Sequence, residues 1–157
     1  MVRKILFVCL GNICRSPAAE GIFKKKIRDR NLEKSFLVDS AGTGGWHVGN
    51  LADPRMREAA MERGINLESR SRKIEVRDLY EFDFILVMDK DNLHALNSLV
   101  IDNSKIIKSK IKLILDYSNS SQFNEVPDPY YGGQKGFDNV LDLLDEAIDG
   151  FIENILN

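Results

Sequence analysis

The chain has 157 residues, of which 43% are hydrophobic and 29% are charged, and its formal net charge at pH 7 is −2. This length and composition are typical of one soluble globular domain, residues 1–157, and they exclude a disordered or fibrous chain. A net charge so close to zero gives no general attraction to nucleic acid, so we expect no nucleic-acid partner.

The first residues and the cysteines predict where the protein acts. Residues 1–10 combine basic and apolar residues like a secretory signal, but Asn12 and Arg15 follow at once and no small-residue cleavage pattern is present. No segment is apolar for long enough to span a bilayer. Cys9 and Cys14 are the two cysteines of the chain, and they form no disulfide framework of the secreted kind. We therefore expect a cytoplasmic protein without an integral membrane segment.

The first predicted elements are a strand and a helix. Residues 3–9 form a short apolar run that favours β structure. Residues 17–30 carry Ala18, Ile22 and Ile27 at helical spacing. The segment between these elements is therefore a loop that leaves the end of a strand and enters a helix.

The middle of the chain predicts a second strand and a second helix. The strand covers residues 36–40 and is followed by the glycine-rich segment 42–45. Asp53-Pro54 then supplies an N-cap and a first-turn proline for a helix over residues 54–63. The polar segment 66–77 shows no periodic pattern, and we predict irregular structure there.

The second half of the chain predicts two more strands, each followed by a helix. Residues 84–88 form the third strand, which leads into Asp89 and a helix, and residues 111–115 form the fourth. The final helix has one continuous apolar face, which we assign to packing. Its members are Phe137, Val140, Leu141, Leu144, Ile148, Phe151, Ile152 and Ile155.

The alternation of strands and helices predicts an α/β fold, with a parallel sheet covered by helices on both faces. Because the connections between parallel strands cross over, all the strands end at the same edge of the sheet, where such folds bind ligands. We expect four loops to meet at that edge. They carry Cys9–Ser16, Ser40–Trp46, Asp89 and Asp128–Tyr131.

The loop over residues 9–16 has the composition of an anion site built around a thiol. Backbone N–H groups of a tight loop and of a helix N-terminus bind anions together. Gly11 and Asn12 tolerate the positive φ angles of such a loop, and Arg15 can hold two phosphate oxygens with its planar fork. Ser16-Pro17 fits the N-cap and first-turn positions of the following helix.

Cys9 is the candidate nucleophile of this loop, because the same donors favour its thiolate. An unperturbed thiol is about 3% ionised at pH 7, so complete ionisation adds only about thirtyfold in rate, or roughly 2 kcal/mol. We therefore expect the larger effect from Arg15 and the loop amides, which stabilise the transferring phosphoryl group. A cysteine that merely packs at the end of a strand is the alternative.

Cys14 has two interpretations, and both stay open. Its side chain packs in the core, or it traps oxidised Cys9 as a reversible disulfide that protects the nucleophile from over-oxidation.

Asp128 is the candidate general acid. Expelling a phenolate is helped by a proton, typically by a factor of about 100 to 10,000, so a carboxylic acid is expected at the same edge of the sheet. Asp128 begins a turn-rich segment after the last predicted strand. On spacing alone, however, it is one of 24 acidic residues, and an ordinary turn aspartate would be favoured.

Five motifs spread over nearly the whole chain resemble those of the low-molecular-weight protein tyrosine phosphatases. They are Val8-Cys9-Leu10-Gly11-Asn12-Ile13-Cys14-Arg15-Ser16-Pro17, Asp39-Ser40-Ala41-Gly42-Thr43, Asp53-Pro54-Arg55, Met88-Asp89 and Asp128-Pro129-Tyr130-Tyr131. The resemblance implies a single-domain, three-layer fold with a four-stranded parallel sheet in the order 2-1-3-4.

The resemblance also implies a catalytic set. Cys9 would be the nucleophile, Arg15 the phosphate binder and Asp128 the general acid. The loop residues that bind phosphate would be Leu10, Gly11, Asn12, Ile13, Cys14, Arg15 and Ser16.

The same resemblance implies supporting residues. Ser16 would stabilise the thiolate with its hydroxyl, and Asn12 and Ser40 would hold the shape of the loop through hydrogen bonds. Trp46, Tyr130 and Tyr131 would wall the cleft around the substrate ring; without the family, these three would rank as packing residues.

One position departs from the family pattern. Members commonly carry a histidine shortly after the segment that matches Gly64-Ile65-Asn66, where it supports the loop asparagine, and Ser69 stands at that position here. Neither His47 nor His94 lies where the motif would recruit it. Because these two histidines also lack nearby ligands, we expect no metal site and no cofactor.

We therefore expect an enzyme that hydrolyses phosphotyrosine in proteins, and small aryl phosphates, through a phosphocysteine intermediate. Its expected partners are tyrosine-phosphorylated proteins, with phosphate or other oxyanions as product or inhibitors, and we expect a monomer. An arsenate reductase of the same fold is one alternative, but it needs further cysteines and none follows Cys14. A non-hydrolytic phosphotyrosine-binding module or a phosphocysteine carrier is another, and retention of Asp128 and Ser16 argues against both.

Overall fold

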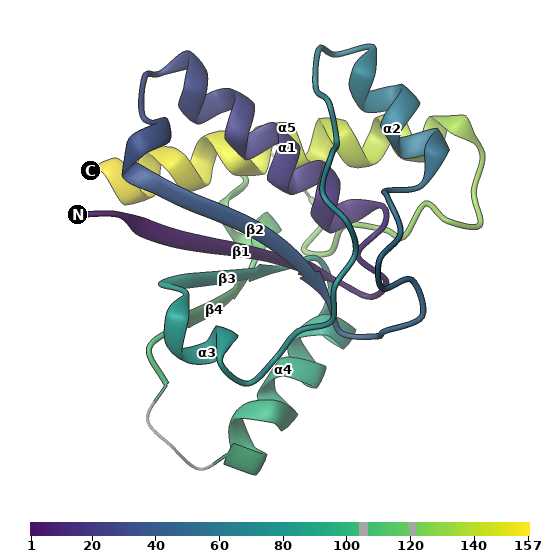
Figure 1. Ribbon diagram of the computed structural model, residues 1–157. Coiled ribbons are helices and arrows are strands. Elements are labelled where there is room, and N and C mark those ends of the chain that lie inside the picture. Colours follow the sequence, from purple (N-terminus) through teal and green to yellow (C-terminus); the bar gives the residue numbers. More distant parts are fainter. Residues whose placement is uncertain (104–106, 120–121) are drawn as a thin grey trace.

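Four parallel strands form one sheet in the computed structural model, which describes residues 1–103, 107–119 and 122–157 (Figure 1). The strands are β1 (Arg3–Cys9), β2 (Phe36–Gly42), β3 (Phe84–Val87) and β4 (Lys110–Leu113). They pair in the order β2-β1-β3-β4. The predicted parallel sheet and its order are confirmed.

Helices cover both faces of the sheet. On one face lie α1 (Arg15–Asp29), α2 (Pro54–Met61) and α5 (Gln134–Leu156), and on the other lie α3 (Asp78–Glu81) and α4 (Lys90–Asn103) (Figure 1). Two short 3-10 helices, η1 (Glu33–Ser35) and η2 (Ile114–Tyr117), complete the described elements. Within the described segments, no helix combines the length and the apolar character needed to cross a membrane.

The strand β1 shows how the sequence creates two cores. Ile5, Phe7 and Cys9 pack on the face covered by α1 and α5, whereas Leu6 and Val8 pack on the opposite face. Successive side chains of a strand point to opposite faces, so a continuous apolar run is what a central strand buried on both faces requires.

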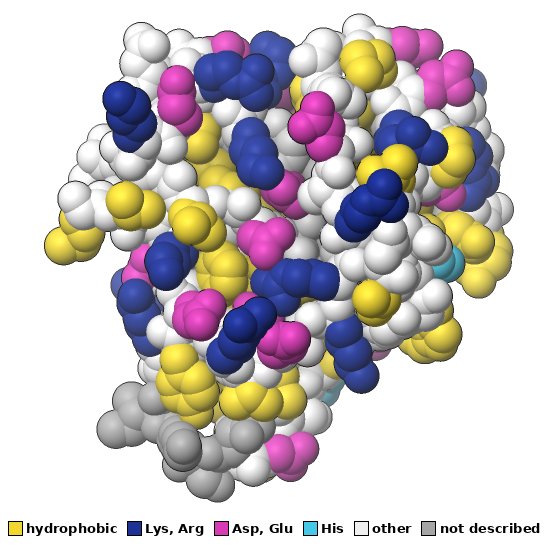
Figure 2. Space-filling model, viewed as in Figure 1, with side chains coloured by type: hydrophobic (Ala, Val, Ile, Leu, Met, Phe, Trp, Pro, Cys, Tyr) yellow, Lys and Arg dark blue, Asp and Glu magenta, His cyan; other side chains and the backbone are white. Residues whose placement is uncertain are grey.

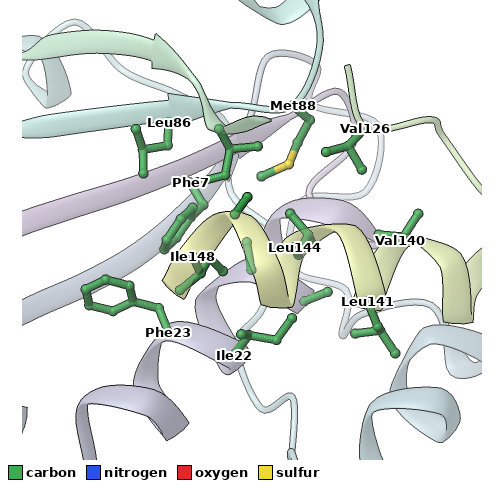
Figure 3. Close-up of a cluster of buried hydrophobic side chains, with 14 of the residues drawn as sticks. Phe7, Ile22, Phe23, Leu86, Met88, Val126, Val140, Leu141, Leu144 and Ile148 are labelled. Atoms are coloured by element: carbon green, nitrogen blue, oxygen red, sulfur yellow. The ribbon is translucent and has the colours of Figure 1, made fainter. Parts of the chain in front are cut away.

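The final helix supplies much of the first core. All eight apolar residues of its predicted face are buried. Leu141, Leu144 and Ile148 of α5 share this core with Ile22 and Phe23 of α1 (Figure 3). The ring of Phe151 lies 6.1 Å from that of Phe23, centroid to centroid. The prediction of a packing face is confirmed.

The fourth strand differs from its prediction, which ran to Leu115. It ends at Leu113, which packs in the core on the α4 side, and η2 follows. Ile114 and Leu115 both pack in the other core. Two consecutive residues cannot reach the same face of a strand, so the chain turns there instead.

The surface carries both signs of charge close together. Figure 2 shows basic and acidic side chains interspersed over the visible face, without one broad field of a single sign. This mixture agrees with the formal net charge of −2.

An alanine substitution at Gly150 tests the close contact between α5 and η2. A Cβ atom at this position would overlap the backbone carbonyl oxygen of Tyr117, whereas a Cβ at Gly136, earlier in the same helix, would meet Pro129 at an ordinary 3.5 Å. Alanine normally stabilises a helix by about 0.5–1 kcal/mol relative to glycine. We expect Gly150→Ala instead to lower the free energy of unfolding by about 1–3 kcal/mol, because the overlap forces α5 away from η2.

Urea unfolding of both variants checks this expectation, with Gly136→Ala as the matched control that is neutral or stabilising. Equal effects of the two substitutions would contradict the close contact.

Candidate active site

Cys9 is the last residue of β1, and the loop after it curls at the carboxyl edge of the sheet. Asn12 adopts a left-handed backbone conformation with φ of 57°. The expectation of positive φ angles is thus met at Asn12, but Gly11 is not among the residues with positive φ. Gly11 instead lies against a ring, because a Cβ there would be 3.0 Å from Cδ2 of His47.

The helix α1 begins at Arg15, two residues earlier than predicted, so Ser16 is not its N-cap. Cys14 occupies the N-cap position and makes no side-chain capping hydrogen bond. The Ser16 hydroxyl is therefore free to face the thiol, and its oxygen lies 3.0 Å from Cys9 Sγ. The backbone N–H of Asn12 also donates to Cys9 Sγ, at 3.3 Å. Two polar groups, the Ser16 hydroxyl and the Asn12 N–H, thus converge on the sulfur.

Several loop amides around the sulfur take no part in hydrogen bonds within the described residues. Within the described segments, the backbone N–H groups of Ile13, Cys14 and Ser16 donate to no protein acceptor. They belong to the first turn of α1 and the loop before it, where the helix dipole adds positive potential. The loop is therefore built to receive an anion in front of Cys9.

Arg15 is fixed before any ligand arrives. Its side chain is only 3% exposed, and Nη1 donates to Asp89 Oδ2 at 2.6 Å and to the carbonyl of Val126 at 3.0 Å. Burial disfavours the cation, but the charge on Cys9 and the hydrogen bond to Asp89 outweigh burial, so the pKa of Arg15 lies above its ordinary value. Asp89 follows β3, so this ion pair ties two loops of the same sheet edge together.

Asp128 reaches the same place from the last loop. Its Oδ2 lies 3.6 Å from Nη2 of Arg15, and its side chain is 38% exposed. Its Oδ1 accepts a hydrogen bond from the backbone N–H of Tyr130 at 3.0 Å. The carboxylate is therefore held at the mouth of the loop that carries Cys9.

A cavity of about 310 Å³ joins these groups. Cys9 and Arg15 line it together with Asp128, and aromatic side chains form part of its wall. The full lining is Cys9, Leu10, Gly11, Ile13, Cys14, Arg15, Trp46, His47, Asp128, Tyr130 and Tyr131. The predicted nucleophile, phosphate binder, acid and cleft residues thus meet in one cavity, while Asn12, Ser16 and Ser40 lie behind it.

Cys14 lines the cavity but differs from Cys9 in its surroundings. Burial raises the pKa of the Cys14 thiol far above its ordinary value, and the negative charges of Asp53, Cys9 and Asp128 raise it further. Cys14 therefore stays protonated at neutral pH. Both cysteines are free thiols.

Comparisons with known proteins show the family of the chain. The model of the family described as low molecular weight phosphotyrosine protein phosphatase matches residues 4–157. The chain belongs to this family. A low molecular weight phosphotyrosine protein phosphatase of Schizosaccharomyces pombe is 40% identical over 97% of this chain and 96% of its own.

Two solved structures show how closely the fold matches. A protein tyrosine phosphatase from Entamoeba histolytica, crystallised with Hepes in the active site, is 44% identical and superposes with a TM-score of 0.92 over 98% of this chain and 97% of its own. A Drosophila arginine phosphatase is 33% identical, with a TM-score of 0.94 over 98% of both chains.

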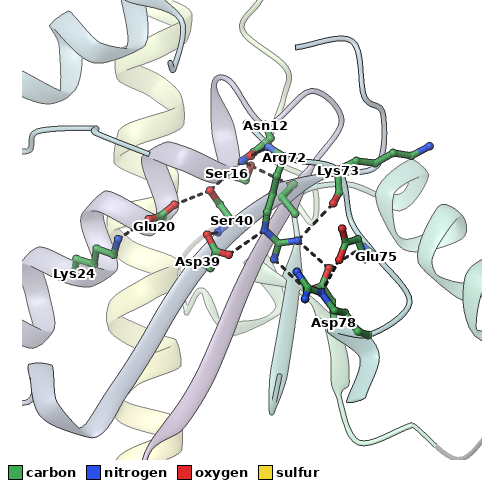
Figure 4. A network of polar contacts seen from close by, with 12 residues as sticks. Asn12, Ser16, Glu20, Lys24, Asp39, Ser40, Arg72, Lys73, Glu75 and Asp78 are labelled. Carbon is green, nitrogen blue, oxygen red and sulfur yellow. Dashed lines mark hydrogen bonds and ion pairs between the residues drawn. The ribbon is translucent and has the colours of Figure 1, made fainter. Parts of the chain in front are cut away.

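Ser69 stands where the resemblance predicted a histidine, and the described residues show which groups support the loop. The backbone N–H of Arg72 donates to Asn12 Oδ1 at 3.0 Å, and the Ser71 hydroxyl donates to the carbonyl of Gly11 at 3.0 Å. Figure 4 shows Arg72 reaching from this segment toward Asp39 and Asp78. The segment predicted to be irregular therefore supports the loop through Ser71 and Arg72.

The other side of Asn12 is held by a chain of hydrogen bonds. Asn12 Nδ2 donates to Ser16 Oγ at 2.7 Å and to Ser40 Oγ at 3.0 Å. The Ser40 hydroxyl donates in turn to Glu20 Oε1 at 2.6 Å, and Glu20 Oε2 pairs with Lys24 at 2.5 Å (Figure 4). Glu20 is buried, so Lys24 balances a carboxylate that would otherwise be costly to bury.

The sequence did not predict the parts that Glu20, Ser71, Arg72 and Asp89 play in this arrangement. Asp89 had been placed at the correct sheet edge, but no pattern linked it to Arg15. Glu20 and Arg72 carried no signal, because their partners are far away in the sequence.

Substitutions at Ser69 and Arg72 test whether the loop is supported by Ser71 and Arg72 rather than by the side chain at position 69. Ser69 lines a separate cavity on the α1 side, and no hydrogen bond of its side chain is present among the described residues. We expect Ser69→Ala to leave kcat/KM for an aryl phosphate within about twofold. Arg72→Gln should lower it by about tenfold or more, because loss of the ion pairs to Asp39 and Asp78 frees the backbone that holds Asn12.

Steady-state kinetics on purified variants provides the measurement. A large loss in Ser69→Ala, or none in Arg72→Gln, would show that the loop is supported in another way.

Proposed function

We propose that this protein hydrolyses phosphotyrosine in proteins through a covalent phosphocysteine, as a single phosphatase domain spanning residues 1–157. One observation carries the proposal: Cys9, the loop residues after it, Arg15 and Asp128 all line one cavity. A thiol, an anion cradle and a carboxylic acid are the three groups that phosphoryl transfer to cysteine needs.

In the first step, the Cys9 thiolate attacks phosphorus and the bond between phosphorus and the phenolic oxygen breaks. Asp128, protonated at this stage, gives its proton to the departing oxygen, so tyrosine leaves as a neutral phenol. The products of this step are phosphocysteine, free tyrosine on the substrate protein and an ionised Asp128.

In the second step, water attacks phosphorus and the bond between sulfur and phosphorus breaks. The Asp128 carboxylate takes the proton of that water, which restores the acid for the next cycle. Inorganic phosphate and the Cys9 thiolate are released together, so atoms and charges balance without any cofactor or metal.

Most of the rate enhancement comes from the anion cradle, which consists of the Arg15 guanidinium and the loop amides. Arg15 and the amides of residues 10–16 hold the three phosphoryl oxygens as charge redistributes, the electrostatic effect that usually dominates such reactions. Asn12, Ser16 and Ser40 keep the cradle in shape and hold a hydroxyl against the leaving thiolate. The raised pKa of Cys14 supports Cys9 as the nucleophile of the pair.

The substrate class follows from the wall of the cavity. Trp46, Tyr130 and Tyr131 offer aromatic surface for a phenyl ring beside the cradle. The Entamoeba relative holds Hepes, whose sulfonate is an oxyanion, in its active site. We therefore take tyrosine-phosphorylated proteins as partners, and phosphate or other oxyanions as product and inhibitors.

Location, assembly and redox control complete the proposal. We propose a monomer that acts in the cytoplasm, where reducing conditions keep the free thiols of Cys9 and Cys14 reduced. We also propose Cys14 as the residue that captures oxidised Cys9. An arsenate reductase is disfavoured, because the sequence contains no cysteine after Cys14.

The roles of Cys9 and Asp128 are tested on a phosphotyrosine peptide and on phenyl phosphate. We expect Cys9→Ser to lower kcat/KM at least about a thousandfold, because a serine hydroxyl is a weak nucleophile at neutral pH. Asp128→Ala should lower it by about 100- to 10,000-fold on phenyl phosphate. Asp116→Ala, an exposed carboxylate that does not line the cavity, serves as the control with unchanged rates.

Substantial turnover by Cys9→Ser would contradict the mechanism, and an undiminished rate in Asp128→Ala would assign the acid elsewhere. A burst of phenol without steady turnover by the unmodified protein would favour the phosphocysteine carrier. Because the Drosophila relative is an arginine phosphatase, phosphoarginine is assayed in parallel. Faster turnover of phosphoarginine than of phosphotyrosine would contradict the proposed substrate.

A further inference from the structure

We propose that Arg55 is a positioning residue that holds Asp128 in place for proton transfer, by tying the loop of Asp128 to the loop of Cys9. This inference rests on the proposed function. It assigns a task to the Asp53-Pro54-Arg55 motif, which the mechanism above does not use.

The loop that carries Asp128 is attached to its surroundings at few points. Val126, two residues before Asp128, is buried; its N–H donates to the carbonyl of Met88, and its own carbonyl accepts from Arg15. Beyond it, Pro129 is buried, but Asp128, Tyr130 and Tyr131 on either side of it are exposed. A loop of this kind does not fix an acid to the precision that proton transfer needs.

Arg55 supplies the missing attachment. Its Nη2 donates to the carbonyl oxygen of Tyr130 at 3.0 Å. Among the described residues, no other element donates a hydrogen bond to the backbone of residues 128–131. The N–H of the same Tyr130 donates to Asp128 Oδ1 at 3.0 Å. Arg55 thus holds the carbonyl of Tyr130, and the N–H of the same residue orients the carboxylate of Asp128.

Arg55 is itself held rigidly from two sides. Asp53 accepts from its Nε at 3.1 Å and its Nη2 at 2.9 Å, a two-point pairing that a lysine could not make. The guanidinium also lies over the ring of Phe137, 4.7 Å from its centroid, and 5.5 Å from that of Tyr130. Phe137 is fully buried in the core, so the arginine rests on a fixed surface.

Asp53 completes the connection to the anion loop. Its backbone N–H donates to the carbonyl of Ile13 at 2.8 Å, and its side chain caps α2 by accepting from the backbone N–H of Arg55. One short segment therefore contacts the loop of the nucleophile at Ile13 and the loop of the acid at Tyr130. This segment is thus a second connection between the two loops, in addition to the contacts of Arg15 with Val126 and Asp128.

The dependence of rate on the leaving group distinguishes positioning of the acid from general damage. Phenyl phosphate has a poor leaving group and needs the proton of Asp128, whereas 2,4-dinitrophenyl phosphate leaves readily without one. For Arg55→Gln we expect kcat/KM to fall at least about tenfold on phenyl phosphate and less than about threefold on dinitrophenyl phosphate. The inhibition constant of vanadate, a phosphate mimic that needs only the cradle, should change by less than about twofold.

Two further variants guard against a folding defect. Arg55→Lys keeps the charge but loses the fork, and should show the same pattern in milder form. Arg63→Gln is the matched control: Arg63 also donates to a carbonyl of a distant residue, that of Asp138 in α5, but does not contact the loop of Asp128. We expect it to affect both substrates equally, if at all.

A double variant provides the decisive comparison. If Arg55 acts through Asp128, then Arg55→Gln combined with Asp128→Ala should be no slower on phenyl phosphate than Asp128→Ala alone. Equal losses on the two substrates, or multiplied losses in the double variant, would overturn the proposal for Arg55. Failure of the unmodified protein to hydrolyse either substrate would instead contradict the proposed function.

Discussion

The left-handed backbone of Asn12, together with the four contacts of this residue, is the constraint on which the active site depends. Its N–H faces Cys9 Sγ, its Nδ2 bonds Ser16 and Ser40, and its Oδ1 accepts from the backbone of Arg72. A conformation that costs about 1–2 kcal/mol in most residues is maintained by partners from three separate segments. The curl that follows directs the loop amides toward one point, which is why the end of a strand becomes an anion site.

Charge in the cavity is balanced before substrate binds. Arg15 lies between Asp89 and Asp128, and its guanidinium faces the loop of Cys9. Burying such a cluster is costly, and it contributes little to stability compared with an apolar core. Its benefit is preorganisation, because an arginine that is already desolvated and oriented needs no rearrangement when the phosphoryl group arrives. The cradle and the acid are thus parts of one electrostatic arrangement, connected on the other side through Asp53 and Arg55.

The sequence predicted the sheet, and it predicted that Cys9, Arg15 and Asp128 would meet in one place, because both predictions depend on local patterns. Apolar runs marked the strands, parallel topology brought Cys9 and Asp128 to one edge, and the motifs of the family selected Asp128 from many acidic residues. The helix start was predicted wrongly because Ser16-Pro17 has the composition of a cap. The hydroxyl of Ser16 is used by the thiol instead.

What the sequence could not predict are contacts between residues that are far apart and lack a pattern. The support of Asn12 by Arg72 spans 60 residues, and that of Tyr130 by Arg55 spans 75. Segment 66–77 has no periodicity, so nothing in it showed that it lies beside the loop. The absence of the family's histidine left the support of the loop open, and only the three-dimensional arrangement revealed Ser71, Arg72 and the chain through Ser40 to Glu20.

The affinity of vanadate for Asn12→Gly tests the central claim most directly. Glycine adopts a positive φ without strain, so this variant keeps the backbone curl and removes only the side-chain hydrogen bonds of Asn12. If those bonds hold the cradle in shape, the dissociation constant of vanadate rises at least about tenfold, which corresponds to about 1.4 kcal/mol. A dissociation constant equal to that of the unmodified protein would show that the backbone curl alone suffices and would contradict this account.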